Sequence, residues 1–465
     1  MNTPGMTPTE RRAAISLAGI FSTRMLGLFM ILPVFALYSE ELSGATPFLI
    51  GLAIGIYGLT QGVFQIPFGM LSDRIGRKPV IYMGLTIFVI GSVVAAMSDS
   101  IVGVIIGRAL QGGGAIAAAV MALAADLTRE EHRLKAMAMI GISMGISFSI
   151  AMVLGPIIDG LFGISGIFWI TAALAVLSMV ILAFVVPNPV VSRFHRDAEP
   201  VPSQFKNVLA DRQLLRLDYG IFALHMILMA SFVAVPLALA EKSGLPSESH
   251  WIVYLVVMVV AFIGMVPFII IAEKKRRMKQ VFTGAIVVLM VSLWGLALFE
   301  YHLYGMVASL LLFFLAFNLL EASLPSLVAK IAPPDKKGTA MGVYTSSQFL
   351  GAFVGGVSGG WLYQHVGSES VFYFCAIAAA IWILLAGTME NPRYLASYMI
   401  NVGDVSDEQA RQLVAQITAL KGVAEVVVIR EDGVAYLKID SQVVDMDELN
   451  KFSITEGVEA SPAQS

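Results

Sequence analysis

Twelve long apolar runs follow one another along most of this chain. Each has about 20 residues, which is the length that a helix needs to cross a lipid bilayer. Of the 465 residues, 57 % are hydrophobic and 14 % are charged, whereas soluble domains carry about 25 % charged residues. The sequence therefore predicts an all-α membrane protein with twelve transmembrane helices. The predicted spans are residues 13–38, 48–72, 79–97, 101–126, 136–162, 165–187, 214–239, 250–272, 280–299, 302–330, 339–364 and 369–389.

The placement of Lys and Arg predicts how the chain lies in the membrane. These residues are concentrated in the N-terminus and in the loops after the even-numbered spans, whereas the loops after the odd-numbered spans hold Lys242 alone. Cytoplasmic loops carry the excess of positive charge, so we expect both termini in the cytoplasm. The net charge of −3 gives no reason to expect nucleic-acid binding by the chain as a whole. The single cysteine, Cys375, excludes a disulfide or a thiolate metal site within one chain.

A charged loop between spans 2 and 3 recurs later in the chain. The segment 66–77, Ile-Pro-Phe-Gly-Met-Leu-Ser-Asp-Arg-Ile-Gly-Arg, aligns with segment 266–277, Val-Pro-Phe-Ile-Ile-Ile-Ala-Glu-Lys-Lys-Arg-Arg. A repeat at this distance indicates a duplicated membrane protein with two six-helix halves and a binding site between them. We predict an N-terminal bundle (1–187), a cytoplasmic linker (188–213) and a C-terminal bundle (214–391).

The composition becomes typical of a soluble domain beyond residue 392. Ser406 and Gln409 form a capping box in front of an amphipathic helix, and strand-like segments lie near 398–402 and over 423–429 and 434–439. With a short helix from Asp445, the order is β-α-β-β-α, which predicts a small α+β ferredoxin-like module within residues 392–465. The last residues, 453–465, are predicted to be a disordered tail.

The loop between spans 2 and 3 resembles the characteristic loop of the major facilitator superfamily. Together with the twelve spans, the duplication and the appended module, it is similar to the drug:proton antiporter-like branch of that family, whose members have two six-helix bundles. The resemblance implies a bacterial inner-membrane protein and a gating role for these residues: Gly69, Asp73, Arg74, Gly76, Arg77, Lys78 and Asp126.

Five of these gating residues have an expected contact or role. Gly69 allows a close helix approach, and Gly76 allows a tight turn. Asp73 could accept backbone N–H groups at a helix N-terminus, and the family pattern implies that this is the start of span 11, near 339–341. The family pattern implies that Arg77 pairs with Asp126. Together these contacts would hold the two halves closed on the cytoplasmic side and stabilise an outward-open state. The alternative is an ordinary positively charged loop.

Two further segments resemble family motifs. Arg108 and Gln111 share one face of span 4, where a buried arginine is costly and usually functional. The alternative is that Arg108 makes only a structural hydrogen bond. Span 5 contains an antiporter-like motif with Gly155, Pro156 and Gly160, although Ala151 and Asp159 stand where that motif has glycine. Its alternative is close helix packing by small residues.

Proton coupling requires a group that titrates within the membrane. The candidates are Glu321, His225, Asp159 and Arg108, with a structural hydrogen bond or ion pair as the alternative for the first two. Span 1 carries Arg24 where many antiporters of this branch have a carboxylate. Other polar side chains in the spans are candidates for the substrate cavity or for hydrogen bonds between helices: Arg24, Tyr57, Gln61, Gln65, Gln111, Asn318, Tyr344 and Gln348.

These features predict a proton-coupled secondary active transporter that exports small molecules by alternating access. It needs no cofactor beyond the proton gradient, and its partners would be an unknown small-molecule substrate, membrane lipids and, through the module, a second copy of the chain. The alternative is a membrane sensor or regulated scaffold whose module reads a cytoplasmic signal. No nucleotide-binding loop, catalytic triad or metal cluster stands out in the sequence, which argues against an enzyme.

Overall fold

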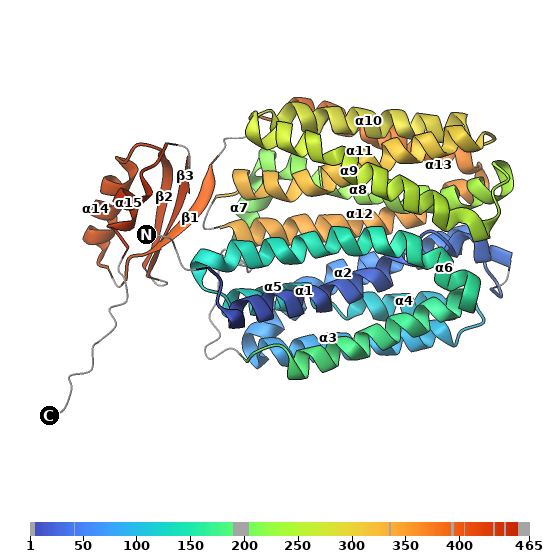
Figure 1. Ribbon diagram of the computed structural model, residues 1–465, viewed down its shortest axis with the longest axis horizontal. Coiled ribbons are helices and arrows are strands. Elements are labelled where there is room, and N and C mark those ends of the chain that lie inside the picture. Colours follow the sequence, from blue (N-terminus) through green and yellow to red (C-terminus); the bar gives the residue numbers. More distant parts are fainter. Residues whose placement is uncertain are drawn as a thin grey trace.

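Two parallel groups of long helices and one small sheet make up the protein (Figure 1). The structure is a computed structural model, which describes residues 5–40, 42–188, 204–333, 336–391, 395–403, 405–430, 433–440 and 443–453. The sheet and its helices stand at one end of the long axis. We call this end of the helices the module end and the opposite end the far end.

The N-terminal group begins at the module end and crosses the molecule repeatedly. Three of its helices begin at a side-chain N-cap: Thr7, Thr46 and Ser100 each accept a backbone N–H that the first turn leaves free. Its elements are α1 (Pro8–Phe29), η1 (Phe35–Glu40), α2 (Pro47–Ile75), α3 (Arg77–Ala96), α4 (Ile101–Gly113), α5 (Ala117–Asp126) and α6 (Glu130–Phe184).

Two of the predicted spans are not continuous helices. Span 1 was expected over 13–38, but α1 ends at Phe29 and the chain continues through turns around Pro33, which lacks a backbone N–H donor. Span 4 was expected over 101–126, but it is divided into α4 and α5. Three successive glycines (112–114) stand at the end of α4, where the break begins. Periodicity alone cannot show such breaks, because the residues around them remain apolar.

The C-terminal group contains the six remaining spans. Helix α8 is buried on almost all sides and forms its centre. The elements are α7 (Phe205–Ala210), which lies in the expected linker, α8 (Arg212–Leu237), η3 (Ala238–Lys242), η4 (Ser247–Ser249), α9 (His250–Lys274), α10 (Met278–Leu298), α11 (Leu303–Ile331), α12 (Lys337–His365) and α13 (Ser368–Gly387).

The twelve predicted spans are all helical in the structure, apart from the breaks in spans 1 and 4. Among the described residues, nine helical stretches are long and apolar enough to cross a membrane. One of them, Lys135–Phe184, contains two spans, because Gly163 breaks α6 with φ +65°. The other two spans are α1 and α12, whose Arg, Ser, Thr, Gln and Gly residues lower their mean hydropathy.

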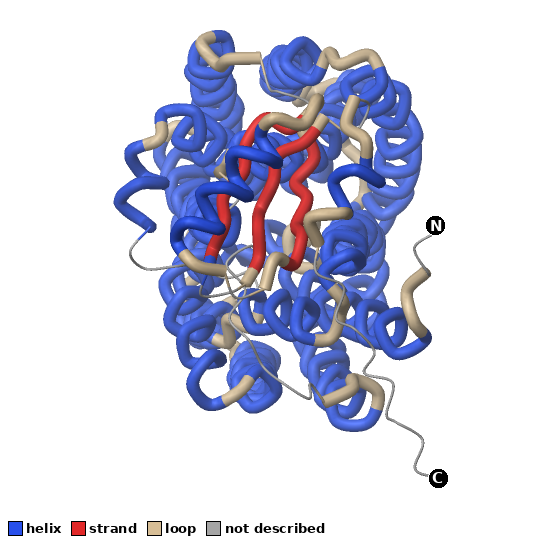
Figure 2. Tube along the Cα trace, turned by 90° about the vertical axis from the view of Figure 1, so that its left-hand side faces the viewer, coloured by secondary structure: helices blue, strands red, loops and turns tan. Residues whose placement is uncertain are grey.

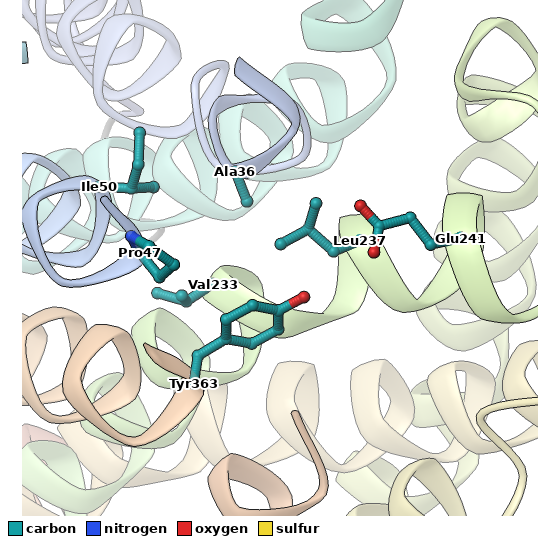
Figure 3. A pocket seen from close by; sticks show the side chains of 7 residues that line it. All are labelled: Ala36, Pro47, Ile50, Val233, Leu237, Glu241 and Tyr363. Carbon is teal, nitrogen blue, oxygen red and sulfur yellow. The ribbon is translucent and has the colours of Figure 1, made fainter. Parts of the chain in front are cut away.

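The two helix groups meet most closely at the far end, where α2 packs against α12. A Cβ atom added to Gly51 would lie 2.2 Å from the Gly356 carbonyl oxygen, and one at Gly58 would lie 2.5 Å from that of Phe349. Small residues of this kind let helix backbones touch. A pocket of about 140 Å³ remains beside this contact, lined by residues of both groups (Figure 3): Ala36, Pro47, Ile50, Val233, Leu237, Glu241 and Tyr363.

The predicted C-terminal module is present with the expected order of elements. Its three antiparallel strands lie in the order β1-β3-β2, so the chain crosses over through a helix before it adds the central strand. The two helices cover one face of the sheet, and the other face turns toward the ends of the long helices (Figures 1 and 2). The elements are β1 (Ala396–Asn401), α14 (Asp407–Thr418), β2 (Val423–Ile429), β3 (Val434–Ile439) and α15 (Met446–Asn450).

The central strand β3 is buried on both of its faces, although one face is polar. Ala435 and Leu437 belong to the core beneath α14 and α15, whereas Lys438 points the other way and is 2 % exposed. Its ammonium group donates hydrogen bonds to the carbonyl groups of Ala329 and Lys330, in the last turn of α11. The sheet therefore rests on the C-terminal half of the transmembrane region.

Candidate functional site

A polar cluster lies where α8, α11 and α12 face one another inside the C-terminal half. The Gln348 side-chain nitrogen is 2.8 Å from His225 Nε2 and 3.4 Å from Glu321 Oε1. The His225 Nδ1 atom lies 3.9 Å from Glu321 Oε2. The Glu321 side chain is 34 % exposed and that of His225 is 5 % exposed, so the carboxyl group connects a buried imidazole to the accessible surface.

Three candidates that were predicted separately therefore form one cluster. Asn318 lies one turn earlier on α11, and its side-chain nitrogen is buried with no hydrogen-bond partner among the described residues. Tyr344, on α12, is buried within electrostatic reach of Glu321 and of a further carboxyl group, that of Asp218. A carboxyl group beside an imidazole and an amide can hold or pass a proton.

Asp218 on α8 was missed in the sequence. Its side chain is buried, and its Oδ2 atom has no hydrogen-bond partner within the described part of the chain. It lies two residues after Arg216 at the start of a predicted span, a position that favours a solvated helix end. The available signal was its spacing of seven residues from His225, which places both side chains on one face of a helix.

A second polar cluster lies in the N-terminal half and has the opposite charge. Arg24 on α1 donates to the hydroxyl of Tyr57 at 3.1 Å and to the side-chain oxygen of Gln61. Gln61 in turn donates to Gln65 at 3.3 Å, one turn further along α2. These four candidates, predicted as cavity residues, thus form a continuous chain of hydrogen bonds.

Arg108 on α4 also lies beside Tyr57. It is completely buried, donates to Gln111 at 3.0 Å and to the Ala53 carbonyl at 3.4 Å, and its guanidinium carbon is 5.1 Å from the centre of the Tyr57 ring. Gln111 donates onward to Ser92 at 2.8 Å. The expected pairing of Arg108 and Gln111 on one helix face is present.

The loop at 69–78 makes most of its expected contacts within the N-terminal half. The buried Arg77 side chain lies 3.3 Å from Asp126 and also binds Asp73 and Ser72. Gly76 has φ +97° and separates α2 from α3. A Cβ atom at Gly69 would lie 3.2 Å from Ala118 on α5. The close approach, the tight turn and the Arg77–Asp126 pair are therefore all present in the structure.

The expected contact between this loop and the start of the eleventh span, which is α12 in the structure, is absent from the described residues. The Asp73 carboxylate binds Arg77 on its own half, and the Thr339 hydroxyl at the start of α12 donates to Gln204 of the linker at 3.3 Å. The halves are instead closest at the far end, so this conformation lacks the module-end closure that the loop was expected to stabilise. Arg74 is exposed, and Lys78 donates to the Val186 carbonyl at 2.7 Å.

The remaining candidates have structural neighbours of their own. A Cβ atom at Gly155 would lie 2.2 Å from the Met30 carbonyl oxygen, so this residue allows α6 to touch the end of α1. Pro156 follows it within α6, and Gly160 has no atom within 4 Å of the corresponding position. Asp159 accepts a hydrogen bond from Tyr38 of η1, which places it in a different part of the molecule from the Glu321 cluster.

Comparison with known proteins shows the family of the chain. The model of the Major Facilitator Superfamily matches residues 17–356 and 315–395. The chain is 50 % identical to the inner membrane transport protein YajR of Escherichia coli over 98 % of this chain and 99 % of that protein. It is 25 % identical to the multidrug resistance protein MdtH of Proteus mirabilis, over 73 % of this chain and 84 % of the relative.

The fold is also similar to that of a solved transporter. A bacterial homologue of the human lysosomal transporter Spinster, described in an inward-facing and unoccupied conformation, matches with a TM-score of 0.65 and 15 % identity, over 83 % of this chain and 98 % of that one. This likeness concerns the fold. The match over most of the chain and the close relative show that this chain is a membrane transporter, not an enzyme, and that it belongs to the major facilitator superfamily.

Proposed function

We propose that this chain is a proton-coupled secondary transporter that exports small molecules by alternating access, with the proton gradient as its energy source. The observation that carries the proposal is the meeting of Glu321, His225 and Gln348 on three different helices of one half. Protonation of Glu321 would remove a charge from this interface and so change how α11 packs against α8 and α12. The distant relative named as a multidrug resistance protein supports export.

The close contact of α2 and α12 at the far end represents one of the two states that alternating access needs. We place the module end in the cytoplasm, because the loops at that end carry the Lys and Arg residues. In that orientation the structure is closed toward the outside of the cell. The 69–78 loop would then form its expected contact with α12 only after the halves rotate.

Transport is tested in proteoliposomes that enclose a pH-sensitive dye. The panel contains lipophilic cations, such as tetraphenylphosphonium and ethidium, and aromatic anions, such as benzenesulfonate and phenyl phosphate. We expect at least one compound to move protons with the wild-type protein and Glu321→Gln to abolish this movement. The control is Glu369→Gln, the same change at an exposed position at the far end, which should leave it intact.

A wild-type rate in Glu321→Gln would exclude this carboxyl group as the proton carrier. The second candidate function, a sensor or scaffold regulated by the module, is favoured by the contact of Lys438 with α11. It would gain support if no compound of the panel moved protons. Light scattering of the purified protein tests whether the module also joins two copies.

A further inference from the structure

Two arginines are buried inside the N-terminal half without a carboxylate partner. Arg24 is 2 % exposed and Arg108 is 0 % exposed. Within the part of the chain that the structure describes, no Asp or Glu lies within 4.0 Å of either guanidinium group. Arg77, which is equally buried, has two carboxylates, so the same half of the protein contains both a paired and an unpaired arrangement.

The uncharged neighbours satisfy only part of each guanidinium group. Arg24 Nη1 and Arg108 Nη2 are buried atoms with no hydrogen-bond partner among the described residues. Among the described residues, the contacts of the two groups are all with uncharged partners. They are the amides of Gln61 and Gln111, the Tyr57 hydroxyl, the Ala53 carbonyl, and the rings of Tyr57 and Phe88. A buried charge without a counter-ion is costly, and such groups in membrane helices usually serve a ligand.

The hydrogen-bond chain extends from Arg24 toward the module end. Gln61 and Gln65 continue it along α2 in the direction of the module end, and Gln65 is 7 % exposed. The far end is closed by the contact of α2 with α12. The C-terminal half has the opposite character, because carboxyl groups without a Lys or Arg partner among the described residues lie on its helices: Asp218 is buried and Glu321 is 34 % exposed.

We propose that the transported substrate is a small organic anion, and that Arg24 and Arg108, which both lie beside Tyr57, bind its carboxylate, sulfonate or phosphate group. The free N–H groups of the two guanidinium forks match the oxygens of such a group. The aromatic ring of Tyr57 beside them suits an anion that carries an apolar or aromatic body. The inference rests on the proposed function in one respect, because it takes the bound anion to be the transported substrate.

The test measures binding without any proton gradient. The midpoint of thermal unfolding of the full chain in detergent is measured with benzoate, benzenesulfonate or phenyl phosphate, and with benzyltrimethylammonium as the cation of similar shape. We expect at least one anion to raise the midpoint in a saturable way and the cation to have no such effect. Arg24→Gln and Arg108→Gln should each abolish the shift, and Arg24→Lys should weaken it because the charge remains but the fork is lost.

Measurements without ligand give a second, independent readout. Because the charge of Arg24 has no counter-ion, Arg24→Gln should raise the midpoint of the ligand-free protein by about 2 °C, whereas Arg77→Gln should lower it. The proposal is overturned if no anion stabilises the wild type, if the cation acts equally, if the shift survives in both arginine variants, or if Arg24→Gln lowers the ligand-free midpoint. Glu321→Gln should retain the anion shift, so a failure of proton coupling would be distinguishable.

Discussion

At the scale of single residues, the partners of each buried arginine separate a structural role from a binding role. Arg77 has Asp73, Ser72 and Asp126 around it, and the Asp126 side chain is fully buried. Arg24 has only uncharged partners. A paired guanidinium stabilises the loop that it joins, whereas an unpaired one lowers stability until an anion arrives.

The Arg77 site gives a prediction about stability. Asp126→Asn should lower the free energy of unfolding by on the order of 3 kcal/mol, because it removes one partner of a fully buried pair. Asp73→Asn should cost less than about 1 kcal/mol, since the Asp73 side chain is 34 % exposed. Thermal unfolding of the two purified variants would compare them, and equal losses would contradict this ranking.

Glu10 gives a prediction about pH. It lies before the first span, and hydrogen bonds from Arg129, with a smaller contribution from Thr7, lower its pKa to about 2 from 4.5. A carboxyl group with a lowered pKa stabilises the fold above pH 4.5, and this contribution is lost as the pH falls from 4.5 through 2. The thermal midpoint of wild type should therefore fall more steeply over that range than that of Glu10→Gln, and parallel curves would contradict the prediction.

At the scale of secondary-structure elements, the contact between α2 and α12 decides which end of the molecule is closed. Glycines follow one another at helical spacing on both helices, at 51, 55 and 58 on α2 and at 356 and 360 on α12. Their missing side chains bring carbonyl oxygens of one helix against the Cα atoms of the other. The contact therefore has no room for a methyl group at these positions of α2.

A single methyl group should therefore shift the conformational equilibrium. Gly51→Ala would place a Cβ atom 2.2 Å from the Gly356 carbonyl oxygen, and we expect the far end to open. The reporter is Ile50→Cys, which is 1 % exposed at this contact; the only native cysteine, Cys375, is fully buried. Labelling from outside by a membrane-impermeant maleimide should rise severalfold.

The matched control for this experiment is Gly113→Ala in the same reporter background. An added Cβ at Gly113 has no atom within 4 Å, so this variant should label as slowly as the parent. Unchanged labelling of the Gly51→Ala variant would contradict the prediction, because it would show that the far end accommodates the added methyl group and stays closed.

At the scale of the whole molecule, the module is joined to the half that carries the Glu321 cluster. Lys438 binds the last carbonyl groups of α11, the helix on which Glu321 lies, and so satisfies acceptors that a helix end leaves free. Arg276, after α9, binds Asp440 at 3.1 Å. This arginine has φ +53° at the position that corresponds to Gly76 in the sequence repeat. Movement of α11 would therefore act on the module.

This arrangement predicts that Lys438→Met releases the module. Lys438 lies on β3 against the end of α11, and burial at this contact lowers its pKa to about 8. Loss of the ammonium group leaves those carbonyls without this donor, so limited proteolysis should cleave the 388–395 connection faster than in wild type. The control is Lys421→Met, at an exposed turn of the same module, and equal cleavage in all three proteins would contradict a docking role.

The sequence predicted much of this structure, because the patterns concerned are local. Capping boxes, apolar runs and the β-α-β-β-α order arise within short segments, and the Arg77–Asp126 pair follows from a family motif. Asp218 and the joining of Glu321 with His225 and Gln348 were not foreseen. Those contacts depend on how three helices are rotated about their axes, which apolar periodicity leaves open when helices are buried on several sides.

By itself, the sequence determined the class of the protein, its two halves, the presence of the module and the residues able to carry charge inside the membrane. Hydrophobic length and charge placement suffice for these, since each span must satisfy its own backbone within the bilayer. Only the tertiary structure decided that the far end is closed, that the module rests on α11, that Glu321 meets His225 and Gln348, and that Arg24 and Arg108 are buried without a carboxylate partner among the described residues. These properties depend on contacts between residues far apart in the chain.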